Sequence, residues 1–190
     1  RQPRSTLFPY TTLFRSVEAR RLYSESLKIV KDLDDKRLVA ISLHNVGLMA
    51  QDTGDTEEAR RLYEESLKIA KDLDAKSSIA SSLGQLGMLA QEAGNLGEAL
   101  RLYSESLKIA KDLDDKRLVA ISLHNLGLLA HYAGDLDEAR RLYSESLKIA
   151  KGLGDKGGVG TSLHQLGMLA QVTGDLAEAH RHYGESLKIA

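Results

Sequence analysis

Apolar residues recur along this chain at spacings of three and four positions, which is the pattern of amphipathic helices. In residues 77–94 the apolar positions that share one helix face are Ile79, Leu83, Leu86, Leu89 and Ala90. In residues 96–113 the positions expected to face inward are Ala99, Leu102, Tyr103, Ser106, Leu107 and Ala110. No strand pattern of alternating apolar and polar residues competes. The pattern therefore predicts an all-α protein.

A short turn with its own residue signals separates these two helices. Gly94 is expected to end the first helix, and Asn95 with Glu98 three positions later forms a capping-box pattern that starts the second. The same signals return at Gly54, Asp55 and Glu58, at Gly134, Asp135 and Glu138, and at Gly174, Asp175 and Glu178. A polar turn of the type KDLDDK closes each unit. The sequence therefore predicts a series of two-helix hairpins.

The hairpins repeat every 40 residues, because a block of the form EARRLYSESLKIA starts at Glu18, Glu58, Glu98, Glu138 and Glu178. This period predicts a partial repeat at 17–36, complete repeats at 37–76, 77–116 and 117–156, and a shortened repeat at 157–190. The first helix of the last repeat carries Gly157, Gly158 and Gly160. Each glycine costs about 1 kcal/mol inside a helix, so we expect fraying there.

Residues 1–16 match none of the repeats and hold both prolines and both phenylalanines of the chain. Their sequence, RQPRSTLFPYTTLFRS, resembles the translation of a short-read sequencing adapter. We therefore expect a non-native leader and exclude it from functional reasoning; the alternative is a native, irregular segment. We also expect the chain to be a window of a longer array whose true N-terminus is missing. Cytoplasmic localisation is then only a default.

The positions that recur in every unit resemble the tetratricopeptide repeat. In one unit they are Leu86, Gly87, Gly94, Ala99, Tyr103 and Leu107, and in the preceding unit Val46, Gly47, Gly54, Ala59, Tyr63 and Leu67. The resemblance covers residues 17–190. The 40-residue period without a closing proline is similar to the long-period subclass of Pins-type adaptors, kinesin light chains and bacterial signalling proteins. It implies an α-solenoid of antiparallel helix-turn-helix hairpins that forms a right-handed superhelix.

Composition and charge narrow the possible functions. The chain is 42% hydrophobic and 28% charged with a formal net charge of −1, so no global field attracts nucleic acid or an anionic membrane. It has no cysteine, which excludes disulfides and thiolate metal sites. No apolar run reaches the roughly 20 residues of a transmembrane helix. Arginines of the second helices are followed four residues later by glutamates, as in Arg61 and Glu65, so we expect ion pairs on a solvated surface.

Possible catalytic or metal-binding groups do not converge in a helical array. Ser122 and His124 are two residues apart, which separates them by about 200° around a helix and prevents a nucleophile–base pair. His180 and His182 project from different sides of their helix in the same way. The glycines at 151–158 lack the strand and the spacing of a phosphate-binding loop. We therefore expect no enzyme activity, no cofactor and no metal.

The resemblance implies that the first helices line a concave groove that binds partners. The groove candidates, which combine amides, imidazoles and apolar side chains, are His44, Asn45, Leu48, Gln51, Gln85, Met88, Gln91, His124, Asn125, Leu128, His131, Tyr132, His164, Gln165 and Met168. A row of amides can donate to and accept from the backbone of an extended peptide. The alternative is that these amides are solvated or brace neighbouring helices. The positions hold no lysine or arginine, which argues against a carboxylate clamp.

Two functions follow from this pattern. The first is a non-enzymatic scaffold that binds a protein or peptide, as a fragment of a larger bacterial signalling or regulatory protein. The alternative is a structural self-assembly element that stacks end to end, because Tyr183, Leu187 and Ile189 have no following unit to cover them. Residues 31–46 and 111–126 are nearly identical, which indicates a duplication of 80 residues and favours structure over tuned recognition. No nucleic-acid or membrane partner is expected.

Overall fold

The computed structural model describes residues 18, 21–22, 25–30, 32 and 34–189. The predicted non-native leader, residues 1–16, lies outside this part of the chain. Two compact units divide the molecule between Leu89 and Ala90, and each is described here by itself. The first unit holds the helices before this boundary and the second holds those after it.

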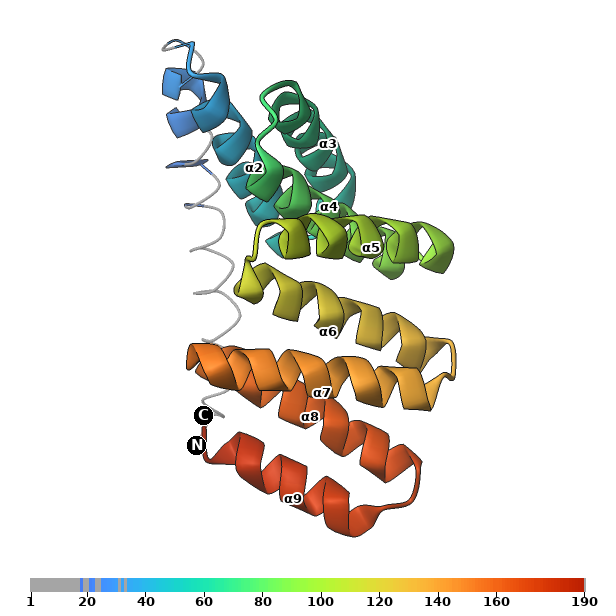
Figure 1. Ribbon diagram of the computed structural model, residues 1–190. Coiled ribbons are helices and arrows are strands. Elements are labelled where there is room, and N and C mark those ends of the chain that lie inside the picture. Colours follow the sequence, from blue (N-terminus) through green and yellow to red (C-terminus); the bar gives the residue numbers. More distant parts are fainter. Residues whose placement is uncertain (1–17, 19–20, 23–24, 31, 33, 190) are drawn as a thin grey trace, which may run out of the picture. The chain divides into compact units, whose positions relative to one another are not determined.

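Residues 34–189 form an all-helical array of stacked hairpins with no strand in this range (Figure 1). The helices are α2 (Lys36–Asp52), α3 (Thr56–Asp72), α4 (Lys76–Glu92), α5 (Leu96–Asp112), α6 (Lys116–Tyr132), α7 (Leu136–Leu153), α8 (Lys156–Val172) and α9 (Leu176–Leu187). Helix α4 crosses the boundary between the units. In the second unit each helix from α6 to α9 packs against the next. The predicted hairpin solenoid is therefore confirmed, while its right-handed superhelix stays a prediction.

Each hairpin turn consists of a glycine followed by a polar residue that serves both helices. Gly134 has a φ of 80°, in the left-handed region that glycine tolerates best. The Asp135 N–H then donates to the Ala130 carbonyl oxygen at 2.9 Å, which closes α6. The Asp135 carboxylate accepts the Glu138 N–H at 3.1 Å, which caps α7. One aspartate thus ends one helix and starts the next.

The predicted capping box forms only in part. A full box would have the glutamate side chain accept the N–H of the cap residue. In α7 the Asp135 N–H is already bonded to Ala130, and the Glu138 carboxylate accepts from Arg141 at 2.6 and 2.7 Å. Asn95, at the corresponding position before α5, makes no side-chain capping bond. At this turn the prediction was therefore right about where α7 begins and wrong about the role of Glu138.

Small residues and tyrosines set the spacing inside each hairpin. A Cβ atom added at Gly127 would lie 2.7 Å from Cε1 of Tyr143, and the same distance is found between Gly47 and Tyr63. Tyr143 is completely buried. Close packing of this kind leaves no room for another methyl group. The glycine of the first helix therefore makes room for the tyrosine of the second in both hairpins.

Buried serines connect successive hairpins. The Ser146 hydroxyl on α7 donates to the Ala120 carbonyl oxygen of α6 at 2.9 Å. The Ser162 hydroxyl of α8 donates in turn to Ser146 Oγ at 3.4 Å. In the first unit Ser66 bonds Ala40 in the same way, at 2.8 Å. Since buried hydroxyls need partners, these bonds hold each second helix against the first helices on both sides of it.

The glycine-rich start of α8 adopts the same helical bounds as its counterparts. α8 begins at Lys156, and the Asp155 side chain accepts the Gly158 N–H at 3.1 Å. Gly157, Gly158 and Gly160 therefore all lie within the helix. The predicted fraying concerns the stability of this turn and stays a prediction.

Candidate functional site

The groove candidates all lie on first helices and share one face of each. On α6, His124, Asn125 and Leu128 are half-buried, and Tyr132 is exposed at the end of the helix. The candidates on the other first helices are His44, Asn45, Leu48 and Gln51 on α2, Gln85, Met88 and Gln91 on α4, and His164, Gln165 and Met168 on α8. Each first helix therefore presents a partly open, mainly uncharged surface.

The histidines of this surface pack on the tyrosines of their own hairpins. The His44 ring centre lies 5.3 Å from that of Tyr63, and the His124 ring lies 5.5 Å from Tyr143. Burial lowers the pKa of His44 and of His124, because an imidazolium would lose hydration there. His164 and Tyr183 form the same pair at 5.5 Å. All three imidazoles thus pack on a tyrosine ring, and burial disfavours the charged form of His44 and His124.

Two of the predicted groove amides brace their hairpins. Tyr63 Oη donates to Gln51 Oε1 at 3.0 Å, and Tyr103 Oη donates to Gln91 Oε1 at 3.2 Å. The two partners are 12 residues apart because the second helix folds back along the first. The constant offset of 12 residues between glutamine and tyrosine is visible in the sequence and is the signal for this bond.

The third hairpin lacks this hydrogen bond because His131 occupies the glutamine position. The Tyr143 hydroxyl is buried and makes no hydrogen bond to any described residue. The His131 ring stacks instead on Tyr132, with ring centres 6.4 Å apart and an interplanar angle of 17°. An unpaired buried hydroxyl costs roughly 1–3 kcal/mol. This hairpin therefore carries a local defect.

Replacing His131 with glutamine is expected to raise the free energy of unfolding by about 1 kcal/mol, because the new amide can accept from Tyr143. Denaturant unfolding followed by circular dichroism measures this change. The matched control is Gln91→His, which removes the existing bond from Tyr103 and is expected to lower stability by a similar amount. A His131→Gln variant less stable than the original chain would contradict the assignment.

A second set of amides, one residue before the Leu-Gly or Val-Gly pair of each first helix, does not brace the hairpins; we call it the amide row. These side chains, all half-buried, are Asn45, Gln85, Asn125 and Gln165. Within the described part of the chain none of the four makes a side-chain hydrogen bond, and Gln85 Oε1 is fully buried without a partner. The solvent-facing atoms of a half-buried amide bond water, which a ligand can displace. The amide row therefore has unused donors and acceptors on the first-helix face.

Serine–histidine pairs do not form a catalytic arrangement. The Ser122 hydroxyl lies between helices, 3.3 Å from Ser106 Oγ, whereas His124 packs on Tyr143. Ser162 is likewise buried and bonded to Ser146. Among the described residues no group of three or more histidine, aspartate or glutamate side chains could hold a metal ion. None of the described helices is long and apolar enough to cross a membrane.

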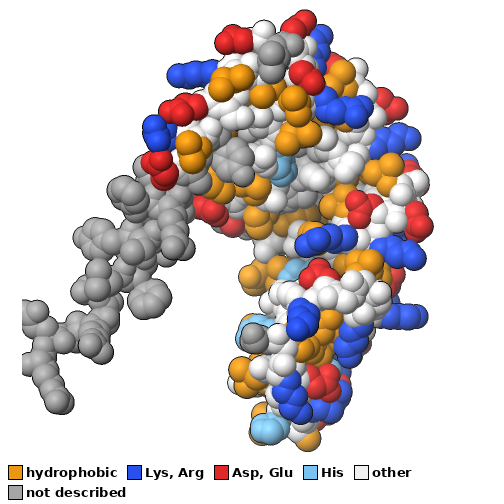
Figure 2. Space-filling model, turned by 90° about the vertical axis from the view of Figure 1, so that its left-hand side faces the viewer, with side chains coloured by type: hydrophobic (Ala, Val, Ile, Leu, Met, Phe, Trp, Pro, Cys, Tyr) orange, Lys and Arg blue, Asp and Glu red, His pale blue; other side chains and the backbone are white. Residues whose placement is uncertain are grey.

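Charged side chains on the second helices pair with one another. The predicted contacts of Arg61 with Glu65 and of Arg141 with Glu145 are present at 3.5 and 3.3 Å. A closer partner lies three residues before each arginine, at 2.7 Å for Glu58 and 2.6 Å for Glu138. On the face shown in Figure 2, basic and acidic side chains are intermixed rather than gathered by sign. A phosphate backbone on this face would meet carboxylates as well as cations among the described residues.

A family model for the tetratricopeptide repeat matches residues 10–72, 78–152 and 118–190. The chain belongs to the tetratricopeptide repeat family. Repeats of this family form helical scaffolds that generally bind proteins, and no enzyme family is indicated. No curated protein matches the chain by sequence.

Solved structures of several tetratricopeptide repeat arrays share this fold. BtubC (BKLC) from P. vanneervenii is 23% identical, with a TM-score of 0.77 over 92% of this chain and 73% of its own. A Rap protein complexed with Competence and Sporulation Factor is 16% identical, with a TM-score of 0.85 over 93% of this chain and 49% of its own. A kinesin light chain structure from Podospora anserina is 23% identical, with a TM-score of 0.67 over 95% of this chain and 90% of its own. The present chain thus spans about half the length of the Rap protein.

Proposed function

We propose that this chain is a non-enzymatic scaffold segment that binds an extended peptide or a partner protein along its first helices, within a larger bacterial signalling or regulatory protein. The observation that carries this proposal is the amide row, whose donors and acceptors are unused within the described structure. The Rap protein of similar fold, which was solved with a peptide factor, supports the same kind of partner.

The chemistry of the amide row suits a peptide backbone. An extended peptide presents a donor and an acceptor at each residue, and a carboxamide can satisfy both. One helical turn after each amide lies an apolar side chain, such as Leu128 after Asn125 or Met168 after Gln165. We infer that the amides fix the peptide backbone and that these apolar groups contact its side chains.

The amide row is tested by peptide-library selection followed by calorimetry with the selected peptide. The double variant Asn45→Ala and Asn125→Ala is expected to bind about 10- to 100-fold more weakly, since each amide offers up to two hydrogen bonds of about 0.5–1.5 kcal/mol. The matched control is Lys68→Ala with Lys148→Ala, two repeats apart on exposed second-helix positions, which should leave binding unchanged. Equal affinity of the amide variant and the original chain would refute the proposal.

Self-association through α9 is the second candidate. Leu176 and Leu187 are 69% and 79% exposed, which leaves apolar surface on this helix. The other two predicted contact residues are half-buried: Tyr183 packs on Gly167, and Ile189 packs against a buried cluster that includes Val159. Of the three residues predicted to be uncovered, only Leu187 is fully exposed, so the apolar surface that they leave is smaller than predicted. A monomer at all concentrations in light scattering would exclude this candidate.

A further inference from the structure

An apolar groove opens between the second helices α5 and α7 of the second unit. It encloses about 510 Å³ and has α6 as its floor. Its apolar lining comes mainly from leucines of the three helices, namely Leu96, Leu100, Leu107, Leu123, Leu126 and Leu142. Leu96 and Leu100 are 40% and 53% exposed, so the groove is accessible from solvent. It lies on the second helices, apart from the amide row.

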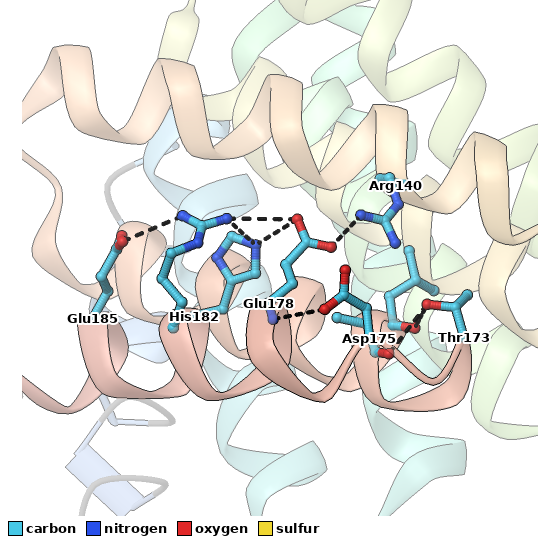
Figure 3. A network of polar contacts seen from close by, with 9 residues as sticks. Arg140, Thr173, Asp175, Glu178, His182 and Glu185 are labelled. Carbon is cyan, nitrogen blue, oxygen red and sulfur yellow. Dashed lines mark hydrogen bonds and ion pairs between the residues drawn. The ribbon is translucent and has the colours of Figure 1, made fainter.

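One residue that differs between two repeats at the same position accounts for the groove. One repeat later, Arg140 of α7 reaches Glu178 of α9 at 2.7 Å and joins the two second helices (Figure 3). The residue equivalent to Arg140 on α5 is Leu100, which cannot pair with a carboxylate. Glu138 and Glu178 each pair with an arginine of their own helix, Arg141 and Arg181, so the contact that Arg140 makes across helices is what differs. The space that an ion pair bridges between α7 and α9 therefore stays open between α5 and α7.

The two walls of the groove differ in charge. The α7 wall carries the carboxylates of Asp135, Glu138 and Glu145 and one guanidinium, that of Arg141. The α5 wall is apolar or uncharged except for Lys111 in its last turn. An occupant that complements both walls therefore has an apolar face and a basic flank.

We propose that this groove binds a basic amphipathic helix of a partner protein, with leucine-like side chains on the α6 floor and lysine or arginine against α7. The enclosed volume lies in the range of about 300–1,000 Å³ that is typical of binding pockets, so it accommodates a few apolar side chains and not a whole helix. An amphipathic helix laid into a groove with its apolar face inward meets this condition. This site goes beyond the proposed peptide surface of the first helices.

The test uses the full chain and a synthetic amphipathic peptide of leucine and lysine, about four helical turns long. Titration calorimetry is expected to show binding that weakens with added salt, because part of the attraction is electrostatic. Leu100→Arg places a guanidinium at the position that Arg140 holds one repeat later and closes the groove, so it should weaken binding about tenfold or more. A leucine–glutamate peptide with the same pattern should not bind.

The reciprocal variant Arg140→Leu removes the bridge to Glu178 and is expected to open a second groove between α7 and α9. It should therefore increase the number of peptides bound per chain. Circular dichroism establishes that both variants remain folded. The double variant Asn45→Ala and Asn125→Ala should bind this peptide normally, which separates failure of this proposal from failure of the proposed peptide surface.

Three results would overturn the proposal. The first is equal peptide binding by Leu100→Arg and the original chain. The second is binding of an uncharged dodecyl amphiphile that Leu100→Arg abolishes, with no binding of the leucine–lysine peptide, which would assign the groove to a lipid-like ligand. The third is a dimer in light scattering that Leu100→Arg dissociates, which would assign the groove to a second copy of the chain.

Discussion

Truncation of Tyr143 to alanine is expected to lower the free energy of unfolding by about 3–5 kcal/mol, the cost typical of removing a large buried aromatic side chain. Tyr143 is fully buried, fills the space left by Gly127 and contacts the His124 ring. Its removal opens a cavity that the rigid helices around it can close only in part. Urea unfolding of the variant and the original chain measures the difference.

A control variant distinguishes the contribution of the Tyr143 ring to stability from that of its hydroxyl. Tyr143→Phe keeps the ring and removes a hydroxyl that has no hydrogen-bond partner among the described residues, so stability should stay the same or rise slightly. Tyr103→Phe instead breaks the bond to Gln91 and should cost about 1 kcal/mol. If both phenylalanine variants lost the same stability, the described difference between the two hairpins would be wrong.

Substitution of Gly127 by alanine is expected to destabilise the chain by about 1–3 kcal/mol, although alanine is the better helix former. The new Cβ would lie 2.7 Å from the Tyr143 ring, closer than real Cβ contacts. Either the tyrosine leaves its position or α6 and α7 move apart, and both lose packing. Thermal unfolding followed at 222 nm, the helical minimum, shows the effect as a lower midpoint.

The same substitution at Gly160 should have the opposite sign. Only the Ser186 hydroxyl oxygen lies near its new Cβ, at 3.8 Å, which is an ordinary contact. Alanine should therefore add about 1 kcal/mol through helix propensity. It should also slow hydrogen exchange in the first turn of α8, where fraying is predicted. If both glycine variants changed stability in the same direction, contact with tyrosine would not decide the outcome.

The hairpins were predictable because each local signal agrees with the others. The apolar spacing, Gly134 and Asp135 all place the end of one helix and the start of the next within a few residues. The glycine opposite a tyrosine was predictable too, since one small and one large residue recur together in every unit. These features depend on neighbours that are close along the chain or repeated in register.

The details of the candidate surface depended on the rotation of one helix against another. The bond between Tyr63 and Gln51 and the packing of His44 on Tyr63 require the exact face that α3 turns toward α2. Periodicity gives the inward face of a helix only to within about one residue position. The sequence therefore could not distinguish the amides that brace a hairpin from the free amides six residues before them on the same helix.

The groove beside Leu100 was missed for a different reason. Its origin is the absence of a contact that another repeat makes between residues 38 positions apart, Arg140 and Glu178. Comparison of the repeats at each register position would have shown the exchange of arginine for leucine. The sequence alone does not give the spacing of α5 and α7, so the exchange of arginine for leucine is indistinguishable there from ordinary variation at a surface position.

Asp135 takes part in two helix ends at once, and this constrains how such an array can change over evolutionary time. Because this residue both closes α6 and caps α7, a codon gained or lost in the turn would disrupt one helix end or the other. Duplication of an intact hairpin leaves every such junction unchanged. Genes for arrays of this kind should therefore vary in the number of whole modules, through unequal crossing-over between near-identical copies, far more readily than in the length of any one module.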